Sequence, residues 1–255
     1  DFMREACDRL NPVFFHFITT GTPYVVMKYA MTADGKIATR TGASKWITGE
    51  AARQKVQELR WSYMGILAGI GTVLADDPLL TVRKEGRRNP IRIICDSRLR
   101  LPLDSKLCRT ADQVPVIAAC ASGAAAGDPE FTARKKALEE RGVRVLEVPD
   151  SPEKVNLGEL MKQLGRENID SILLEGGGRL NESALRAGIV REIREFIAPK
   201  LFGGGGRSPV EGPGVETPDQ AFPLELTEIS RIEEDLLLSW KVIDGKEKKI
   251  CLQES

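Results

Sequence analysis

The sequence is poor in the residues from which metal centres and histidine-based catalytic triads are built. Its 255 residues include one histidine, His16, and five widely separated cysteines without a C-x-x-C pair. This inventory argues against a zinc enzyme, a Ser-His-Asp hydrolase and a disulfide framework. We therefore expect no metal site, and a protein that works in a reducing cytoplasm.

Net charge and long apolar runs are missing as well. The 37 lysine and arginine residues balance 37 acidic residues, so no overall field attracts nucleic acid or an anionic membrane. No apolar run approaches the roughly 20 residues that span a bilayer, and the N-terminal residues lack the layout of a signal peptide. We expect neither a nucleic-acid partner nor a membrane.

What the chain has is an alternation of apolar runs and amphipathic stretches. Runs such as PYVVMKYAM, IRIICDS and VPVIAAC are typical of buried strands, and ITGEAARQKVQELRWS and EFTARKKALEERG are typical of helices. Near the end, EIREFIAPKLFGG, LELTEISRIEE and DLLLSWKVID follow one another as strands. The pattern predicts the α/β class, with a mostly parallel central sheet, helices on both faces and an antiparallel C-terminal end.

The pattern also predicts where the domain and its site lie. We expect one continuous domain, whose first residues have a helix broken before Pro12 and an aromatic-rich turn ending near Gly21. Ligands of open parallel sheets bind beyond the carboxyl ends of the strands. The residues after each apolar run are therefore the site candidates.

A glycine turn follows the apolar run SILL. Glu175 and three glycines come before a helix that we expect to begin near Leu180, whose N–H groups and dipole would favour an anion. The spacing is not G-x-G-x-x-G, because Asn181 stands at the place of the third glycine, and no Walker lysine is present. This stretch alone fits a phosphate cradle and a tight left-handed turn equally well.

Lys28 interrupts an otherwise apolar strand, close to the expected end of that strand. A charge there is costly unless it is paired, so a structural salt bridge is one interpretation. The other is functional, because Lys28 and Glu175 are opposite charges near the ends of two strands and could face one site.

Other strand-end residues are ambiguous by themselves. Trp46 fits either the core or a cleft that takes a flat ring, and Asp76 and Asp77 fit a helix cap and a turn better than a metal site. Arg98 is either solvated or placed for the 2′-phosphate of a dinucleotide. The cluster Gly203–Gly206 is more typical of a mobile loop than of a phosphate cradle.

Five ordered motifs together resemble one family. KYAMTADGKIAT, SKWITG, GTVLADDPLLTVR, CDSRLRLP and LLEGGGRLNESAL occur in the order found in the reductase domain of bacterial riboflavin biosynthesis proteins. The resemblance extends over roughly Thr22 to Asp244, almost the whole chain, and implies a reductase domain over residues 22–250 after a helical linker over residues 1–21. It implies a dihydrofolate reductase-like fold, 5-amino-6-(5-phosphoribosylamino)uracil reductase activity, and a homodimer.

The family also implies a neighbouring domain. In this family the reductase usually follows a zinc-dependent deaminase, and REACDRLNPVFFHFITTGTPYV resembles the connection between the two. The deaminase signature itself is absent here. We expect either a stand-alone reductase or part of a bifunctional protein with a deaminase domain.

The resemblance implies a reaction and a set of site residues. Hydride would pass from NADPH to C1 of the ribose moiety in its ring-opened imine form, giving the ribitylamino product. Lys28 and Glu175 are the catalytic candidates, which we expect to orient the sugar hydroxyls and help to keep the imine protonated. The implied substrate contacts are Ser44, Arg60, Leu80, Arg83 and Glu175, the two arginines suiting the 5′-phosphate. The implied cofactor contacts are Ala30, Trp46, Thr72, Asp76, Ser97, Arg98, Gly177, Gly178, Arg179, Leu180 and Asn181.

Alternatives stay open at this point. A reductase of the same fold could act on the non-deaminated diaminopyrimidine, which carries the same phosphate; a pterin or folate substrate fits Arg60 and Arg83 less well. A non-catalytic dinucleotide-binding module would bind the cofactor without oxidising it. Ser97 and Arg98 favour NADPH over NADH only modestly.

Overall fold

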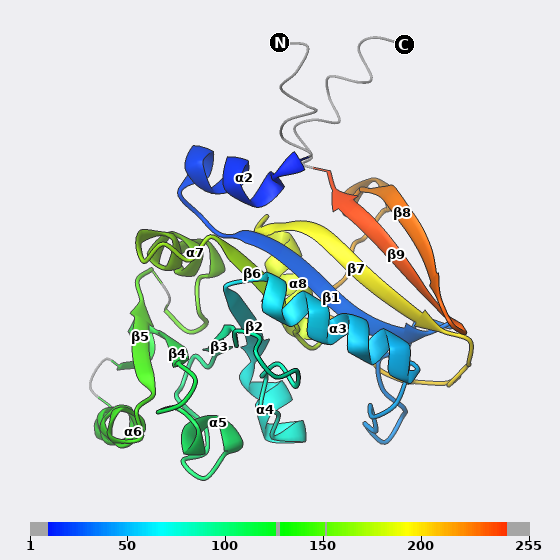
Figure 1. Cartoon of the computed structure of the whole chain (residues 1–255). Coiled ribbons are helices and arrows are strands. Elements are labelled where there is room, and N and C mark those ends of the chain that lie inside the picture. Colours follow the sequence, from blue (N-terminus) through cyan, green and yellow to red (C-terminus); the bar gives the residue numbers. More distant parts are fainter. Residues whose placement is uncertain (1–9, 126–127, 151, 244–255) are drawn as a thin grey trace. The chain divides into compact units, whose positions relative to one another are not determined.

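The structure is a computed structural model that describes residues 10–125, 128–150 and 152–243 (Figure 1). Within these residues the chain forms two compact units, each assembled from two stretches of sequence. The first unit comprises residues 10–24 and 59–173, and the second comprises residues 25–58 and 174–243. The expected domain limits remain predictions, and the linker residues 1–9 lie outside the described residues.

The first unit is built on five strands in the order β5-β4-β3-β2-β6, and the neighbours from β2 to β5 pair in parallel. Every residue of β4 and β6 is buried, because helices cover this part of the sheet. The strands are β2 (Gly65–Gly69), β3 (Ile91–Cys95), β4 (Val116–Ala121), β5 (Arg144–Val148) and β6 (Ser171–Leu174).

The helices of the first unit follow the apolar runs along the chain, as the alternating pattern predicts. One core cluster joins side chains of β2, β3 and β4 to α4, α5 and α6. The helices are α2 (Pro12–Thr20), α4 (Ile70–Asp76), α5 (Lys106–Arg109), α6 (Pro129–Glu140) and α7 (Leu157–Arg166), with a short 3₁₀ turn over Ser122–Ala125.

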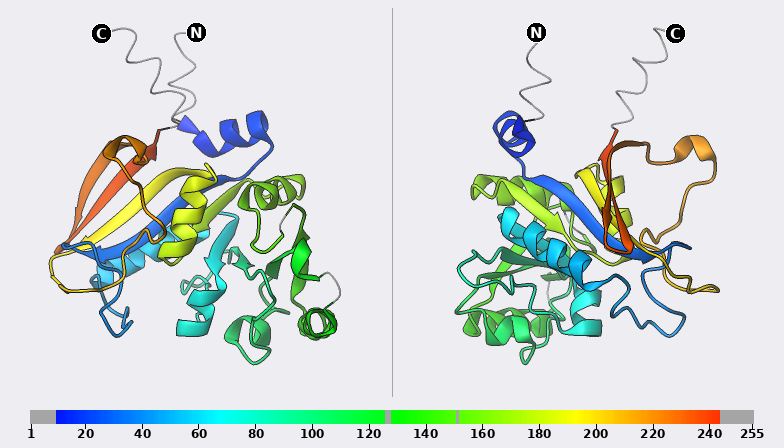
Figure 2. Two further views of the ribbon diagram at one scale, coloured as in Figure 1. Left: turned by 180° about the vertical axis from the view of Figure 1, so that it is seen from behind. Right: turned by 45° about the vertical axis from the view of Figure 1, so that its right-hand side comes forward.

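The second unit contains the antiparallel end of the fold. Its strands occur in the order β1-β7-β9-β8; β1 and β7 are parallel, and the β9 pairings with β7 and β8 are antiparallel. The orange and red hairpin β8–β9 lies beside the yellow strand β7 in all three views (Figures 1 and 2). The elements are β1 (Tyr24–Thr32), α3 (Glu50–Ser62, which ends in the first unit), α8 (Gly178–Arg186), β7 (Val190–Ala198), a 3₁₀ turn (Pro218–Gln220), β8 (Leu224–Ile232) and β9 (Asp235–Val242).

The predicted fold class is therefore confirmed, with one local correction. Residues 12–20 form helix α2 rather than an aromatic-rich turn. Pro12 starts this helix, because its fixed φ suits the first helical position, and the Asn11 side chain caps it by accepting from the Phe14 N–H at 3.2 Å. Gly21 then closes the helix in the left-handed conformation.

No helix within the described ranges is long and apolar enough to cross a membrane.

Candidate active site

Lys28 lies in the middle of β1 rather than near its end, because the strand continues to Thr32. It is half-buried and is level with Arg194 of β7. Its ammonium lies 5.8 Å from the centre of the buried Phe196 ring. Alternate residues of a strand share a face, so Lys28 and the cofactor candidate Ala30 lie on the same side of β1.

Glu175 is the first residue after β6 and is half-buried. The next three glycines do not form a left-handed turn, since none of them has a positive φ. That interpretation of the glycine turn is wrong. Helix α8 begins at Gly178, two residues earlier than expected, with Gly177 as its N-cap in an extended conformation.

Close packing is what requires glycine at two of these positions. A Cβ atom on Gly178 would lie 2.5 Å from the carbonyl oxygen of Ser208, and a Cβ atom on Gly176 would lie 2.7 Å from Oδ1 of Asn181. Asn181 is fully buried and donates from Nδ2 to the Pro209 carbonyl at 2.8 Å. The chain after the second glycine cluster therefore packs on the first turn of α8.

The first turn of α8 has the chemistry of an anion site. No side chain caps the helix at Gly177, and the first N–H groups of a helix have no acceptor within the helix. The N-terminal end also carries the positive end of the helix dipole. Arg179 is exposed in this turn, whereas Leu180 is half-buried. This arrangement fits the phosphate interpretation of the glycine turn.

Trp46 is not a core residue, because 66% of its surface is exposed. It has a φ of 65°, and the Arg53 guanidinium stacks on its ring at 4.2 Å from the centroid. Lys200 Nζ donates to the Trp46 carbonyl at 3.2 Å. These contacts hold an exposed ring in place, and the substrate candidate Ser44 lies half-buried two residues earlier.

The second glycine cluster is anchored at its start by Asp34. The Asp34 carboxylate accepts from the Thr32 hydroxyl at 2.5 Å and from the Phe202 and Gly203 N–H groups at 3.1 and 2.7 Å. The hydrogen bond from Thr32, together with those from Gly203 and Phe202, lowers the pKa of Asp34 to about 2. An isolated bridge between Ala38 and Arg207 holds the other end of the loop.

In the first unit, the substrate candidate Leu80 has an unusual backbone and a buried side chain. Its φ is 52°, and its side chain is 3% exposed within the core cluster. Only its main chain is therefore placed to contact a ligand. The neighbouring carbonyls are held on both sides: Arg60 Nη1 donates to Thr81 O at 3.0 Å, and Arg92 Nη1 donates to Leu79 O at 3.3 Å.

Arg83 is exposed in the loop that follows Val82. The Val82 N–H donates to Asn89 Oδ1 at 2.8 Å, which closes the base of this loop. The ring of Trp61 receives two cations of the same loop, with Lys84 Nζ at 5.1 Å and the Arg87 guanidinium at 4.9 Å from its centroid. The loop that carries Arg83 is thus tied to the end of α3.

Of the Asp76–Asp77 pair, Asp77 is a helix cap, as the sequence suggests, whereas Asp76 lies in the helix and not in a turn. Asp77 caps α4 in the left-handed conformation, and its Oδ1 accepts from the Lys106 N–H at 2.9 Å. Asp76 is exposed at the last position of α4, and Thr72 is half-buried in its first turn. Within residues 10–125, 128–150 and 152–243, no group of three His, Cys, Asp or Glu side chains could hold a metal ion.

The turn after β3 is organised by Asp96, a residue that sequence reasoning missed. Asp96 is fully buried and its Oδ2 accepts from the Leu101 N–H at 2.7 Å; burial raises the pKa of this carboxyl. Ser97 Oγ accepts from the Val155 N–H at 3.2 Å, and Arg98 is exposed. The only local signal for Asp96 was a charged residue directly after an apolar strand.

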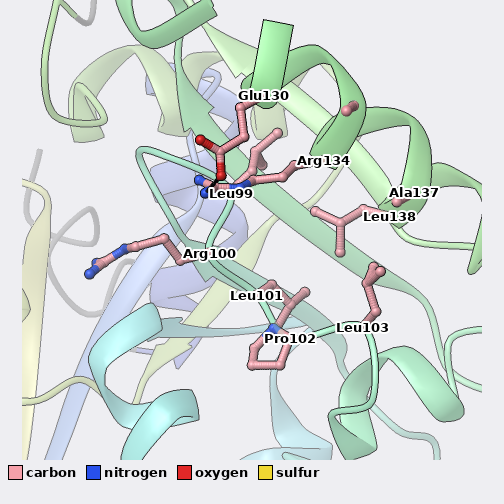
Figure 3. A pocket seen from close by; sticks show the side chains of 10 residues that line it. Leu99, Arg100, Leu101, Pro102, Leu103, Glu130, Arg134, Ala137 and Leu138 are labelled. Carbon is pink, nitrogen blue, oxygen red and sulfur yellow. Dashed lines mark hydrogen bonds and ion pairs between the residues drawn. The ribbon is translucent and has the colours of Figure 1, made fainter. Parts of the chain in front are cut away.

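Figure 3 shows a pocket of about 500 Å³ next to this turn. It is lined by residues from Leu99 to Leu103 and by Glu130, Arg134 and other residues of α6. A second hollow of about 420 Å³ includes Arg98, whose carbonyl accepts from Arg134 Nη1 at 3.4 Å. Of the predicted site residues, only Arg98 lines either pocket.

The predicted site residues divide between the two units. The second unit carries both catalytic candidates and the glycine turn. Its predicted site residues are Lys28, Ala30, Ser44, Trp46, Glu175, Gly177, Gly178, Arg179, Leu180 and Asn181. The first unit carries Arg60 and Arg83, the two arginines proposed for the substrate phosphate. Its other predicted site residues are Thr72, Asp76, Leu80, Ser97 and Arg98.

The sequence of this chain matches one known protein family over most of its length. The family model described as the RibD C-terminal domain matches residues 23–238. The chain belongs to this family. The resemblance seen in the five motifs is thereby confirmed at the level of the family and its fold.

Two relatives and one solved structure show the range of the RibD C-terminal domain family. Riboflavin biosynthesis protein RibD of Actinobacillus pleuropneumoniae is 48% identical over 242 residues, which are 94% of this chain and 62% of that protein. A 2,5-diamino-6-ribosylamino-4(3H)-pyrimidinone 5′-phosphate reductase of Methanothermobacter thermautotrophicus is 38% identical over 224 residues, which are 86% of this chain and 98% of that protein.

The solved structure is a diaminohydroxyphosphoribosylaminopyrimidine deaminase/5-amino-6-(5-phosphoribosylamino)uracil reductase of Thermotoga maritima. It matches with a TM-score of 0.76 and 27% identity, over 94% of this chain and 62% of that chain. This chain therefore spans less than two thirds of the bacterial RibD proteins that it resembles. The homodimer and the cytoplasmic location remain predictions.

Proposed function

We propose that this chain is an NADPH-dependent reductase of riboflavin biosynthesis that reduces the ribose moiety of 5-amino-6-(5-phosphoribosylamino)uracil. The observation that carries the proposal is family membership over residues 23–238. It is supported by the archaeal relative, which is named as a pyrimidinone 5′-phosphate reductase and is matched over 98% of its length. The region that this chain shares with the Methanothermobacter protein is therefore nearly the whole of that reductase.

The second unit supplies features that suit a dinucleotide. The uncapped first turn of α8, with glycines that let the backbone come close, suits the pyrophosphate of NADPH, and the exposed Trp46 ring suits a flat cofactor ring. Arg98 and Ser97 in the first unit suit the 2′-phosphate side of the cofactor. When bound, NADPH supplies the hydride that the reaction needs.

The first unit supplies cations for the substrate. Arg60 and Arg83 suit the 5′-phosphate, since a guanidinium carries several N–H donors in a planar fork. Arg60 also donates to the Thr81 carbonyl, so its position is fixed relative to the segment that contains Leu80. The main chain at Leu80, rather than its buried side chain, is then the group offered to substrate.

Lys28 and Glu175 complete the proposal. We propose that both residues contact the opened sugar chain of the substrate. The Glu175 carboxylate would stabilise the protonated imine nitrogen, and the Lys28 ammonium would donate to the sugar hydroxyls. Hydride delivered to C1 would leave the proton on the imine nitrogen, so the product would be a secondary amine, and the one proton taken up by the ring oxygen on ring opening would come from solvent. Neither residue has to give up a proton permanently, which fits a site without an obvious general acid.

Two pyrimidines are candidate substrates, the deaminated uracil compound and the non-deaminated diaminopyrimidine. The relative with 48% identity is a bacterial RibD protein, and the Thermotoga protein is named as a reductase of the deaminated uracil compound. We therefore propose the deaminated substrate, with a deaminase domain or a separate deaminase as its source. The name of the archaeal relative supports the diaminopyrimidine as the second candidate.

The test follows nicotinamide absorbance with NADPH and, separately, with NADH. The deaminated pyrimidine is generated in place by a deaminase, and the non-deaminated compound is the control. We expect oxidation that needs both NADPH and the deaminated pyrimidine. Faster oxidation with the non-deaminated control compound would identify the diaminopyrimidine as the substrate instead. Cofactor binding without oxidation of either compound would leave a non-catalytic dinucleotide-binding module.

A further inference from the structure

Arg92 is a buried cation to which the proposed chemistry gives no role. It lies on β3 with 0% of its surface exposed. Its guanidinium donates to four uncharged acceptors: Leu79 O at 3.3 Å, Thr110 Oγ1 at 2.8 Å, Thr110 O at 2.9 Å, and Val114 O. No carboxylate among the described residues forms an ion pair with it.

Packing alone does not explain an arginine at this position. Burial of a cation without a carboxylate is costly, and burial lowers the pKa of Arg92 to about 10. An apolar side chain of similar length would fill the same space without that cost. What distinguishes the guanidinium is that it joins two segments, the carbonyl of Leu79 and the connection from Thr110 to Val114.

The Leu79 carbonyl matters because of the residue after it. Leu80 has a φ of 52°, a conformation that a leucine rarely adopts. Arg92 holds the carbonyl before Leu80, and Arg60 holds the carbonyl of Thr81 after it. The strained residue is therefore fixed from both sides by guanidinium groups, and the loop with Arg83 begins two residues later.

The cofactor side of the same stretch has separate supports. The Asp77 N–H donates to Val73 O at 2.9 Å, and Asp77 Oδ1 accepts from the Lys106 N–H at 2.9 Å. These bonds fix α4 and the cofactor candidates Thr72 and Asp76 without using Arg92. Loss of Arg92 is therefore expected to disturb the segment after Leu79 more than the segment before it.

We propose that Arg92 is a positioning residue for the substrate-binding segment Leu79–Arg83, acting through the Leu79 carbonyl. The proposal rests on the proposed function, because it assigns that segment to the phosphorylated pyrimidine. It requires Arg92 to affect recognition of the pyrimidine while leaving recognition of NADPH nearly unchanged.

The test compares Arg92→Lys and Arg92→Met with the control Thr110→Val. The control removes an acceptor from the same guanidinium and a hydrogen bond of the Thr110 hydroxyl to Lys106 O, but leaves the bond to Leu79. We expect both Arg92 variants to raise KM for the pyrimidine about tenfold or more, with KM for NADPH within about twofold. The control is expected to change neither KM to that extent.

Hydrogen exchange gives a second readout that needs no turnover. Amides from Leu80 to Asn89 should exchange faster in Arg92→Lys than in the wild type, while amides of α4 keep their protection. If Arg92→Met does not fold, Arg92→Lys and this measurement still decide. An unchanged pyrimidine KM with unchanged exchange, or equal effects in Thr110→Val, would overturn the proposal. Inactive wild-type protein would instead refute the proposed function, while exchange would still report whether Arg92 orders the segment.

Discussion

Gly178 faces the carbonyl oxygen of Ser208 at a distance that leaves no room for a side chain. A Cβ atom there would lie 2.5 Å from that oxygen and 2.6 Å from Cγ of Glu211. The Glu211 N–H also donates to the Gly178 carbonyl at 2.9 Å. The first turn of α8 is therefore set by a segment about 30 residues away along the chain, as close packing of this kind requires.

We expect Gly178→Ala to weaken NADPH binding by about tenfold or more, because the clash with main-chain atoms must move the first turn of α8. Equilibrium titration with NADPH measures this. Gly205→Ala is the matched control: Gly205 also lies in the second unit, has no positive φ, and its added Cβ would meet no atom within 4 Å. Equal NADPH affinity in both variants would show that the first turn of α8 does not bind the cofactor.

Glu175→Gln is expected to lower kcat by about 10² while NADPH affinity changes by less than about twofold. The amide keeps the shape of the carboxylate but cannot stabilise a protonated imine by charge. Steady-state kinetics and NADPH titration separate the two effects. Equal losses of turnover and of cofactor affinity would assign Glu175 to binding alone.

Trp46 should report cofactor binding by fluorescence. Its ring is exposed and held by Arg53, so a nicotinamide or adenine ring stacked nearby is expected to quench it. In Trp46→Phe most of the NADPH-dependent quenching should disappear, whereas Trp61→Phe should retain it. The reverse pattern would place the cofactor nearer to Trp61.

Asp34 gives a prediction for the acid range. Hydrogen bonds from Thr32, Gly203 and Phe202 lower the pKa of this carboxyl to about 2. Its contribution to stability is then present above the unfolded pKa of about 3.9 and is lost as pH falls through about 2. A carboxyl-carbon NMR titration should show a midpoint near 2, and Asp34→Asn should lose protection of the Gly203 amide at every pH. A midpoint near the ordinary value would contradict the anchoring of this loop.

The sequence predicts the fold well because the relevant signals are local. Apolar runs and capping residues are local patterns, so the order of strands and helices along the chain follows from them, and so does a helix cap within the Asp76–Asp77 pair. The aromatic-rich turn expected after Pro12 is a helix instead, because a proline that cannot continue one helix can still occupy the first position of another. Which of the two applies depends on the residues on both sides: Asn11, before Pro12, and Gly21, after the helix, supply the two caps.

The site is harder to predict because its supports are distant in sequence. The glycines at 176 and 178 are visible in the sequence, but their reason lies in contacts with Asn181 and Ser208. Arg92 looks like any arginine at the start of a strand, since its carbonyl acceptors leave no trace in residue types. For Leu80, the family resemblance implies a substrate contact, but the burial of its side chain, which leaves its main chain as the available group, is visible only in the structure.

The most direct test of the account follows the hydride itself. The chain is supplied with NADPH carrying deuterium on the transferable position of nicotinamide C4 and with the deaminated phosphoribosylaminopyrimidine, and the product is analysed by mass spectrometry and NMR. The account predicts a ribitylamino product with one deuterium at C1 of the former ribose. Product without deuterium at that carbon, or no product although NADPH binds, would contradict it.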